Sequence, residues 1–151
     1  MATDEFPDSL ADVLAGVHRL VRRRLRRGLT SPPLRGAQAE LLRLVGVRPG
    51  IRVSDAAKEL YVAGNSVSTL VNQLTRAGYL TRESDPDDRR SVRLRLTPAA
   101  HERLRDWQTR RGELVRAQVA RLSDEDRAAL AAALPALRRL AGHLHEEVEG
   151  S

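Results

Sequence analysis

Seven polar side chains share one side of the segment spanning residues 65–76, and their chemistry is hydrogen bonding rather than catalysis. The apolar residues of this segment recur at helical spacing and form a stripe that faces a core: Val67, Leu70, Val71 and Leu74. A solvated face usually carries Lys, Glu and Arg, because these are good helix formers. Short amides and hydroxyls instead suit base edges and phosphate oxygens in a major groove. The candidate recognition residues are Asn65, Ser66, Ser68, Thr69, Asn72, Gln73 and Arg76.

Two β-like segments and a charged loop follow this helix. Gly78 is expected to end the helix, because glycine readily takes the positive φ of a C′ residue. Within residues 91–96, apolar and basic or polar side chains alternate, so one face is apolar and the other basic. The loop at 84–90 is too polar to bury and carries the turn signal Asp-Pro. The order of helix, strand, basic loop and strand describes a winged helix, whose helix would enter the major groove and whose wing would reach a minor groove or the backbone.

The wing sequence makes a family resemblance specific. The run DPDDRR at 85–90, preceded by AGYLTR at 77–82 and followed by a strand and Leu-Thr, resembles the wing of MarR-family (multiple antibiotic resistance regulator) transcription factors. The match extends from about Leu10 to Leu144. The resemblance implies a dimeric DNA-binding repressor or activator whose winged helices are carried by intertwined terminal helices. It also implies a small molecule that binds between the terminal helices and the winged helix.

We expect some wing residues to contact DNA and one, Asp88, to hold the loop in position. Asp88 is acidic in a segment that approaches DNA, so we expect a structural role, a pair with Arg82 on the strand before the loop. Arg89 would then enter the minor groove, where a narrow groove concentrates negative potential. Arg90 or Arg93 would contact a nearby phosphate.

Helical patterns on both sides extend the chain beyond the winged helix. We expect residues 1–31 to be an N-terminal dimerisation helix, 32–97 the winged helix-turn-helix DNA-binding domain, and 98–151 C-terminal dimerisation helices. The terminal helices are rich in Leu and Ala on more than one face, which favours a homodimer built from both chain ends. The fold class is therefore mainly α, with a winged helix-turn-helix and a small antiparallel β-wing.

Local signals predict most boundaries inside these parts. Residues 51–53 are β-branched and short, as expected for a third strand of the wing sheet. Ser54 and Asp55 would cap the next helix, and Gly64 would allow the sharp turn into the recognition helix. Residues 30–33, Thr-Ser-Pro-Pro, indicate a linker.

The terminal helices have signals of their own. A helix start is indicated at Pro7, and another at Thr97 with proline following as the first helical residue. Ser123 precedes three acidic residues and is expected to cap the last helix. Pro135 would interrupt and kink that helix.

Composition narrows the class of protein. The chain has 151 residues, a net charge of +6, a pI near 11.0 and no cysteine, which excludes disulfides, thiolate metal sites and peroxide sensing through a thiol. Residues 1–31 carry six basic and four acidic side chains, residues 32–97 carry eleven and seven, and residues 98–151 carry nine of each. The excess of positive charge therefore lies in the winged helix and the first helix. No stretch suits a membrane span, and we expect a cytoplasmic protein without a membrane partner.

Other functions fit less well. No nucleophile and base, paired carboxylates or phosphate-cradling glycine loop stands in a credible context, so we expect no catalytic residues, no cofactor and no metal site. His143 and His145 are about 200° apart around a helix and cannot chelate one ion from it. The alternative function is a non-sequence-specific architectural nucleic-acid-binding protein, against which the polar recognition face argues.

The sequence therefore predicts a transcriptional regulator that binds double-stranded DNA at specific sequences. We expect a repressor that acts as a homodimer on a palindromic, inverted-repeat operator, with a possible small-molecule effector. His18 and Trp107 are the only candidates for an effector pocket, and each is also a normal core or interface residue.

Overall fold

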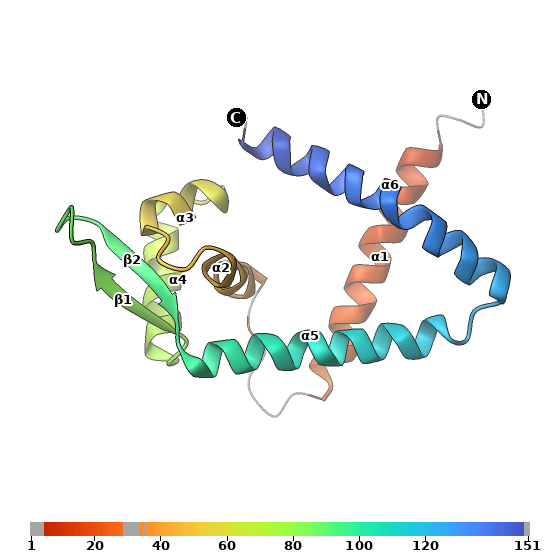
Figure 1. Cartoon of the computed structure of the whole chain (residues 1–151), viewed down its shortest axis with the longest axis horizontal. Helices are drawn as coiled ribbons and strands as arrows, with labels where there is room; N and C mark the ends of the chain where they lie inside the picture. Colours follow the sequence, from red (N-terminus) through yellow and green to blue (C-terminus); the bar gives the residue numbers. More distant parts are fainter. Residues whose placement is uncertain (1–4, 29–33, 35, 150–151) are drawn as a thin grey trace. The chain divides into compact units, whose positions relative to one another are not determined.

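A computed structural model describes residues 5–28, 34 and 36–149 of the chain. Within these ranges the elements are α1 Phe6–Arg26, α2 Gly36–Val47, α3 Val53–Glu59, α4 Gly64–Arg76, β1 Leu80–Ser84, β2 Val92–Leu96, α5 Pro98–Val119 and α6 Asp124–Glu149 (Figure 1). The predicted fold class, mainly α with a winged helix-turn-helix and a small antiparallel wing, is confirmed. The predicted linker at 30–33 lies outside the described residues.

The chain divides into two compact units. One unit comprises residues 1–33 and 106–121, and so contains α1 and the second part of α5. The other comprises residues 34–105 and 122–151, and contains the helix-turn-helix, the hairpin, the start of α5, and α6.

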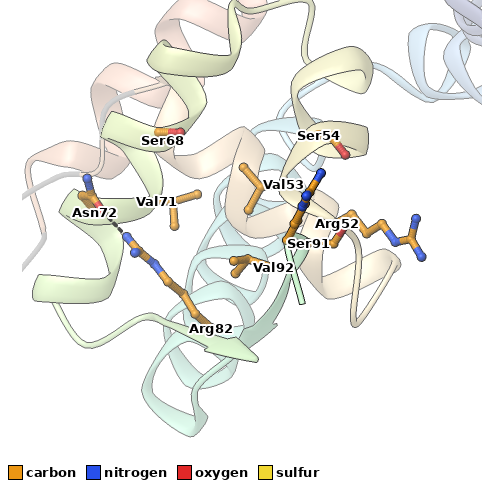
Figure 2. A pocket seen from close by; sticks show the side chains of 10 residues that line it. Arg52, Val53, Ser54, Ser68, Val71, Asn72, Arg82, Ser91 and Val92 are labelled. Carbon is orange, nitrogen blue, oxygen red and sulfur yellow. Dashed lines mark hydrogen bonds between the residues drawn. The ribbon is translucent and has the colours of Figure 1, made fainter. Parts of the chain in front are cut away.

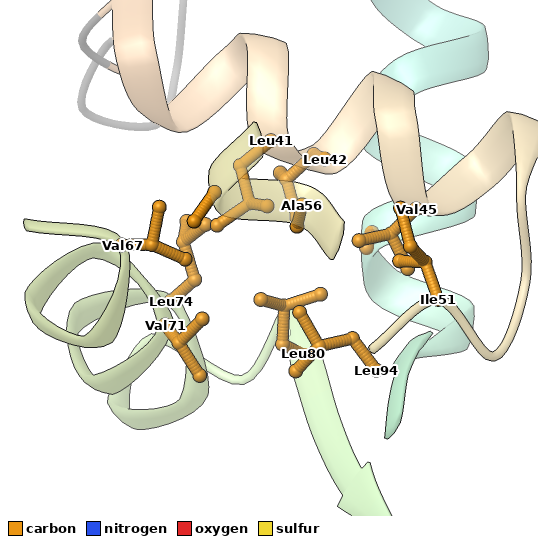
Figure 3. Close-up of a cluster of buried hydrophobic side chains, with 12 residues drawn as sticks. Leu41, Leu42, Val45, Ile51, Ala56, Val67, Val71, Leu74, Leu80 and Leu94 are labelled. Carbon is orange, nitrogen blue, oxygen red and sulfur yellow. The ribbon is translucent and has the colours of Figure 1, made fainter. Parts of the chain in front are cut away.

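The winged helix is built around one apolar cluster. Side chains from α2, α3, α4 and both strands converge there, as Figure 3 shows. The stripe predicted for α4 supplies Val67, Val71 and Leu74, each at most 2% exposed, and Leu70 packs against the cluster from its edge. Burying these side chains fixes the rotation of α4 about its axis, so its polar side must face away from the core. The other buried members are Leu41, Leu42, Val45, Ile51, Ala56, Ala57, Leu80, Leu94 and Ala100.

β1 and β2 form an antiparallel hairpin in which Leu80 lies opposite Leu96 and Ser84 opposite Val92. The third strand predicted at 51–53 is reduced to a single bridge between Arg52 and Arg93. The reason is that α3 already begins at Val53. The predicted cap at Ser54 and Asp55 is wrong for the same reason, since Arg52 is the N-cap and no side chain caps the helix.

Both helices of the helix-turn-helix are followed by a residue with positive φ. After α4, Gly78 has φ +83°, its N–H donates to Thr75, and the N–H of Tyr79 donates to Leu74, as predicted for a C′ glycine. After α3 the left-handed residue is Tyr61, with φ +52°. The expectation that Gly64 allows the sharp change of direction is wrong, because Gly64 has no positive φ and is the first residue of α4.

The starts of the terminal helices agree with the sequence signals. Pro7 lies in the first turn of α1. Thr97 Oγ1 accepts a hydrogen bond from the N–H of Ala100 at the start of α5, and Ser123 Oγ accepts one from Asp126 at the start of α6. Pro135 lies inside α6 and does not interrupt it, which corrects that part of the expectation.

Candidate nucleic-acid interface

The outer face of α4 carries every recognition residue expected from the sequence. All seven side chains are exposed: Asn65, Ser66, Ser68, Thr69, Asn72, Gln73 and Arg76. They are exposed because the opposite side of the helix is committed to the core through Val67, Val71 and Leu74. The helix also begins without a side-chain cap, so its first N–H groups are not occupied by a neighbouring side chain. An α-helix with a free N-terminus and a polar outer face can accommodate phosphate and base edges.

Two hydroxyls on this face have a defined donor direction. Ser68 Oγ donates to the carbonyl of Gly64 at 3.0 Å, and Thr69 Oγ1 donates to the carbonyl of Asn65 at 3.0 Å. A hydroxyl has one proton and two lone pairs, so each group turns its lone pairs toward solvent. Such groups can accept a hydrogen bond from an exposed amino group of a base.

Asp85 is the buried acid of the wing, with 1% of its surface exposed. Its Oδ2 lies 2.8 Å from Nη2 of Arg52 and 3.2 Å from Nη2 of Arg93. Its Oδ1 accepts a hydrogen bond from the backbone N–H of Asp87 at 3.0 Å, which forms a tight turn at the start of the loop. The loop is therefore joined to β2 and to the residue before α3.

These contacts favour the charged form of Asp85. The hydrogen bond from the Asp87 N–H, with the charges of Arg93 and Arg52, holds the pKa of Asp85 below its ordinary value of 3.8, although burial acts in the opposite direction. The Asp85 carboxylate is thus ionised at neutral pH.

Asp88 folds the tip of the wing rather than pairing with Arg82. Its carboxylate accepts hydrogen bonds from the backbone N–H of Arg90 at 3.0 Å and from Ser91 Oγ at 3.1 Å. The predicted pair between Arg82 and Asp88 is wrong, because Asp88 bonds within its own loop and Arg82 bonds to α4. Arg89 and Arg90 are exposed at the tip, and Arg90 also lines the cleft beside the wing.

The other wing arginines are already engaged by the protein. Arg82 donates a hydrogen bond through Nη2 to Oδ1 of Asn72 on α4. Arg93 is held by Asp85 and also donates to the carbonyl of Gly50 at 3.3 Å. The sequence predicts that Arg93 contacts DNA from the wing, but its guanidinium is already bound within the protein and therefore has a structural role.

A cleft of about 490 Å³ lies between α3, α4 and the hairpin (Figure 2). Its polar lining comes mostly from arginine and short hydroxyl or amide side chains, and its floor includes Val71 and Val92. The lining residues are Arg52, Val53, Ser54, Ser68, Val71, Asn72, Arg82, Arg90, Ser91 and Val92. The cleft thus joins the recognition helix and the wing into one basic, polar surface.

Sequence reasoning misses the two residues that organise this surface. The sequence pattern assigns Arg52 to a strand and Asp85 to an exposed turn. One signal points to Asp85, the Asp-Pro pair at the junction of strand and loop, which commonly begins a turn. No local signal marks Arg52 as its partner, because the contact joins segments far apart in the sequence.

The two candidates for an effector pocket lie in the other unit. His18 is exposed on α1, and Trp107 is partly buried on α5. Among the helices that the structure describes, none is both long enough and apolar enough to cross a membrane.

The fold and this surface define a winged helix-turn-helix protein, and comparison with known proteins gives the family. Residues 31–91 match the sequence model of the MarR family. A crystal structure from Pseudomonas aeruginosa, described as a candidate transcriptional regulator, is 32% identical with a TM-score of 0.71 over 88% of this chain and 94% of that one. The chain belongs to the MarR family, whose members are transcriptional regulators that bind DNA.

Two further structures share the fold over nearly the whole chain. FabT from Streptococcus pneumoniae, crystallised in complex with DNA, is 25% identical, with a TM-score of 0.70 over 93% of this chain and 98% of that one. A MarR family protein from Bacillus stearothermophilus is 20% identical, with a TM-score of 0.75 over 94% of this chain and 97% of that one. A comparison with curated protein sequences gave no match.

Proposed function

We propose that this MarR-family regulator is a homodimeric repressor that reads an inverted-repeat operator in double-stranded DNA. The observation that carries the proposal is the exposed face of α4, whose short amides and hydroxyls project beside an arginine-bearing wing. FabT, which has the same fold, was crystallised in complex with DNA, and this supports the same partner here.

In the proposed complex α4 lies in the major groove. Ser68, Thr69 and Asn72 occupy the middle of the exposed face and read bases. The remaining polar residues lie toward its ends or edges and contact bases or phosphates: Asn65, Ser66, Gln73 and Arg76.

The wing completes the proposed interface from the flank. Arg89 reaches the adjoining minor groove, and Arg90 contacts a nearby phosphate. The other wing residues position these two groups from within the protein: Arg82, Asp88 and Arg93.

The homodimer is proposed from the apolar side chains that a single copy leaves in solvent. On α1, Val13 is 61% exposed and Val17 is 55% exposed. On α6, Leu130 and Leu144 are more than half exposed. Repeated exposure along the same helices is typical of a surface that a partner covers. We assign residues 1–31 and 98–151 to dimerisation and 32–97 to DNA binding.

A dimer explains how one small domain could select an operator. Two copies of α4 related by a two-fold axis would read two half-sites of opposite orientation, about one helical turn apart. Occupation of such an operator would block transcription, and we assign this activity to the cytoplasm. An effector that changes the spacing of the two reading helices would relieve repression, with His18 and Trp107 as candidate contacts.

Selection of bound sequences from random DNA, followed by footprinting with the full-length protein, tests the proposal. A discrete protected site with an inverted repeat supports it. Uniform protection that grows with protein concentration, with equal affinity for scrambled DNA, would instead identify an architectural DNA-binding protein.

A further inference from the structure

Two residues expected to act separately are joined in the structure. Asn72 lies on the exposed face of α4, and Arg82 lies on β1. Figure 2 shows the Arg82 side chain extending from the strand to the Asn72 amide, where Nη2 donates to Oδ1. A base-reading candidate is therefore held by a residue of the wing.

The chemistry of this contact fixes its direction. A guanidinium has only N–H donors, so the amide must turn its oxygen toward Arg82. The Nδ2 end then points away, and among the described residues no hydrogen-bond partner occupies it. The contact between Gln38 Nε2 and Gln73 Oε1, at 3.1 Å, differs because two amides can exchange donor and acceptor by flipping together.

Arg82 is itself held in place by the hairpin. Its backbone lies opposite Leu94 in the strand register, and Leu94 is fully buried in the core. Its side chain crosses the cleft whose floor includes Val71 and Val92. The guanidinium is thus positioned before DNA arrives, and little further ordering is needed for it to hold Asn72.

We propose that Arg82 determines base specificity by acting through Asn72, which it presents to DNA as a hydrogen-bond donor. The proposal rests on the proposed function, in which α4 reads the major groove. Guanine, adenine and thymine each offer an acceptor on that edge, whereas cytosine offers only its N4 amino donor. The base facing Asn72 should therefore be any base other than cytosine.

This role differs measurably from a phosphate contact by Arg82. Loss of a phosphate contact weakens binding to all sequences equally, because the backbone carries the same charge everywhere. Loss of a positioning residue changes the ratio of affinities among bases at one position. Ratios measured within one variant also cancel the general effect of its changed net charge.

The experiment measures the affinity of the full-length protein for the selected operator and for a panel with every base replaced in turn. Asn72→Ala identifies the position that Asn72 reads, since discrimination there should disappear. In the wild type, cytosine at that position should bind roughly tenfold more weakly than the preferred base, as for one direct base contact. Arg82→Met should bring this ratio close to one at that position alone.

Two further variants test the direction of the hydrogen bond. Arg82→Lys keeps a donor and should retain the wild-type ratios. Arg82→Glu supplies an acceptor, which would turn the Asn72 oxygen toward the base and shift the preference toward cytosine or adenine, the bases with amino donors. Arg89→Met is the matched control: it removes the same charge from the wing, and should lower affinity while leaving the base ratios at the position read by Asn72 unchanged. Thermal unfolding shows whether each variant is folded. If Arg82→Glu does not fold, the base ratios of Arg82→Met alone test the proposal.

Unchanged base ratios in Arg82→Met, or no effect of Asn72→Ala at any position, would overturn the inference. Either result in a protein that still selects an operator leaves the proposed function intact. A wild-type protein that binds operator and scrambled DNA equally would instead refute the proposed function.

Discussion

The carboxylate of Asp85 lies 2.8 Å from Nη2 of Arg52, so the start of the wing loop is tied to the residue that precedes α3. Arg93 of β2 shares the same carboxylate oxygen at 3.2 Å. A single buried acid thus connects the loop, the hairpin and the helix-turn-helix. Because this connection lies beneath the wing tip, it should control where Arg89 and Arg90 point.

Asp85→Asn should loosen the wing while keeping the shape of the side chain. The two arginines would be left without their ionic partner, the melting temperature should fall, and operator affinity should drop by about tenfold, as expected when one flank of the site is no longer held. Calorimetry and gel shifts check these two results. Asp87→Asn is the control, since Asp87 uses its backbone N–H in the turn and its side chain is exposed. Equal effects of both changes would mean that the loss of stability and affinity comes from local charge and not from the buried ion pairs of Asp85.

The same ion pair predicts a pH dependence. The folded pKa of Asp85 is below its ordinary value of 3.8, so its stabilising contribution is complete above that value and is lost as the pH falls through the folded pKa. The difference in stability between wild type and Asp85→Asn should therefore be constant from neutral pH to about 5 and shrink below 3.8. A difference that already shrinks between pH 7 and 5 would contradict this assignment.

The polar face of α4 should carry specific binding. Replacing Ser68, Thr69 or Asn72 by Ala should weaken operator binding by about 1–3 kcal/mol for each side chain that reads a base, and leave non-specific binding almost unchanged. Gel shifts with operator and scrambled duplexes separate the two. Equally weakened binding to both duplexes would show that these side chains only position the protein on the backbone.

Two substitutions at the wing tip distinguish the effect of loop geometry on operator affinity from the effect of net charge. Arg89→Ala should lower affinity and make the slope of log K against log salt shallower by roughly 0.9 for each phosphate-neutralising charge removed. Asp88→Ala should also weaken binding, although it removes a negative charge, because the carboxylate holds Ser91 and the N–H of Arg90 in the tip. Tighter operator binding by a folded Asp88→Ala protein would show that net charge outweighs the geometry of the tip.

The two left-handed helix ends should respond oppositely to substitution. Tyr61 has φ +52° and is 56% exposed, so Tyr61→Gly should relieve backbone strain at little cost in packing and stabilise the fold by about 1 kcal/mol. Gly78 has φ +83°, and Gly78→Ala should destabilise by about 1 kcal/mol even though no atom obstructs the added Cβ. Thermal or urea unfolding measures both. A destabilised Tyr61→Gly protein would mean that the tyrosine ring packs more strongly than its exposure suggests.

The sequence is sufficient for features that depend on local pattern. The apolar spacing of Val67, Val71 and Leu74 predicts which side of α4 is buried, and hence that Ser68 and Asn72 are exposed. Glycine at 78 and the hydroxyl residues at 97 and 123 predict helix boundaries, because capping depends on residues only a few positions apart.

Contacts between residues far apart in the chain cannot be predicted from local sequence patterns. Sequence proximity favours a pair between Arg82 and Asp88, whereas the partner of Arg82 is Asn72 on the preceding helix. Asp85 is predicted to lie in a solvated turn because nothing near it in the sequence reveals Arg52. Glycine is the residue type that usually adopts a left-handed turn, although tertiary structure imposes that conformation on a tyrosine after α3.

The apolar residues of α6 should hold the proposed dimer together. Leu130 and Leu134 are 51% and 47% exposed in the single chain and lie one helical turn apart. Replacing both by Glu would place two charges in the proposed apolar interface, and burying charge there is strongly unfavourable. The double variant should be a monomer by light scattering, and its operator binding should fall to the level of a single half-site.

A matched control separates the interface from net charge. Arg139→Glu changes the net charge by the same two units as the double variant, and it lies exposed on the same helix. It should remain dimeric, because reversing an exposed charge on the surface of a helix costs little. If the Leu130 and Leu134 double variant also stays dimeric with wild-type stability, these side chains are solvent-exposed in the assembly. The dimer would then have to form through other residues, of which the exposed Val13 and Val17 of α1 are the next to test in the same way.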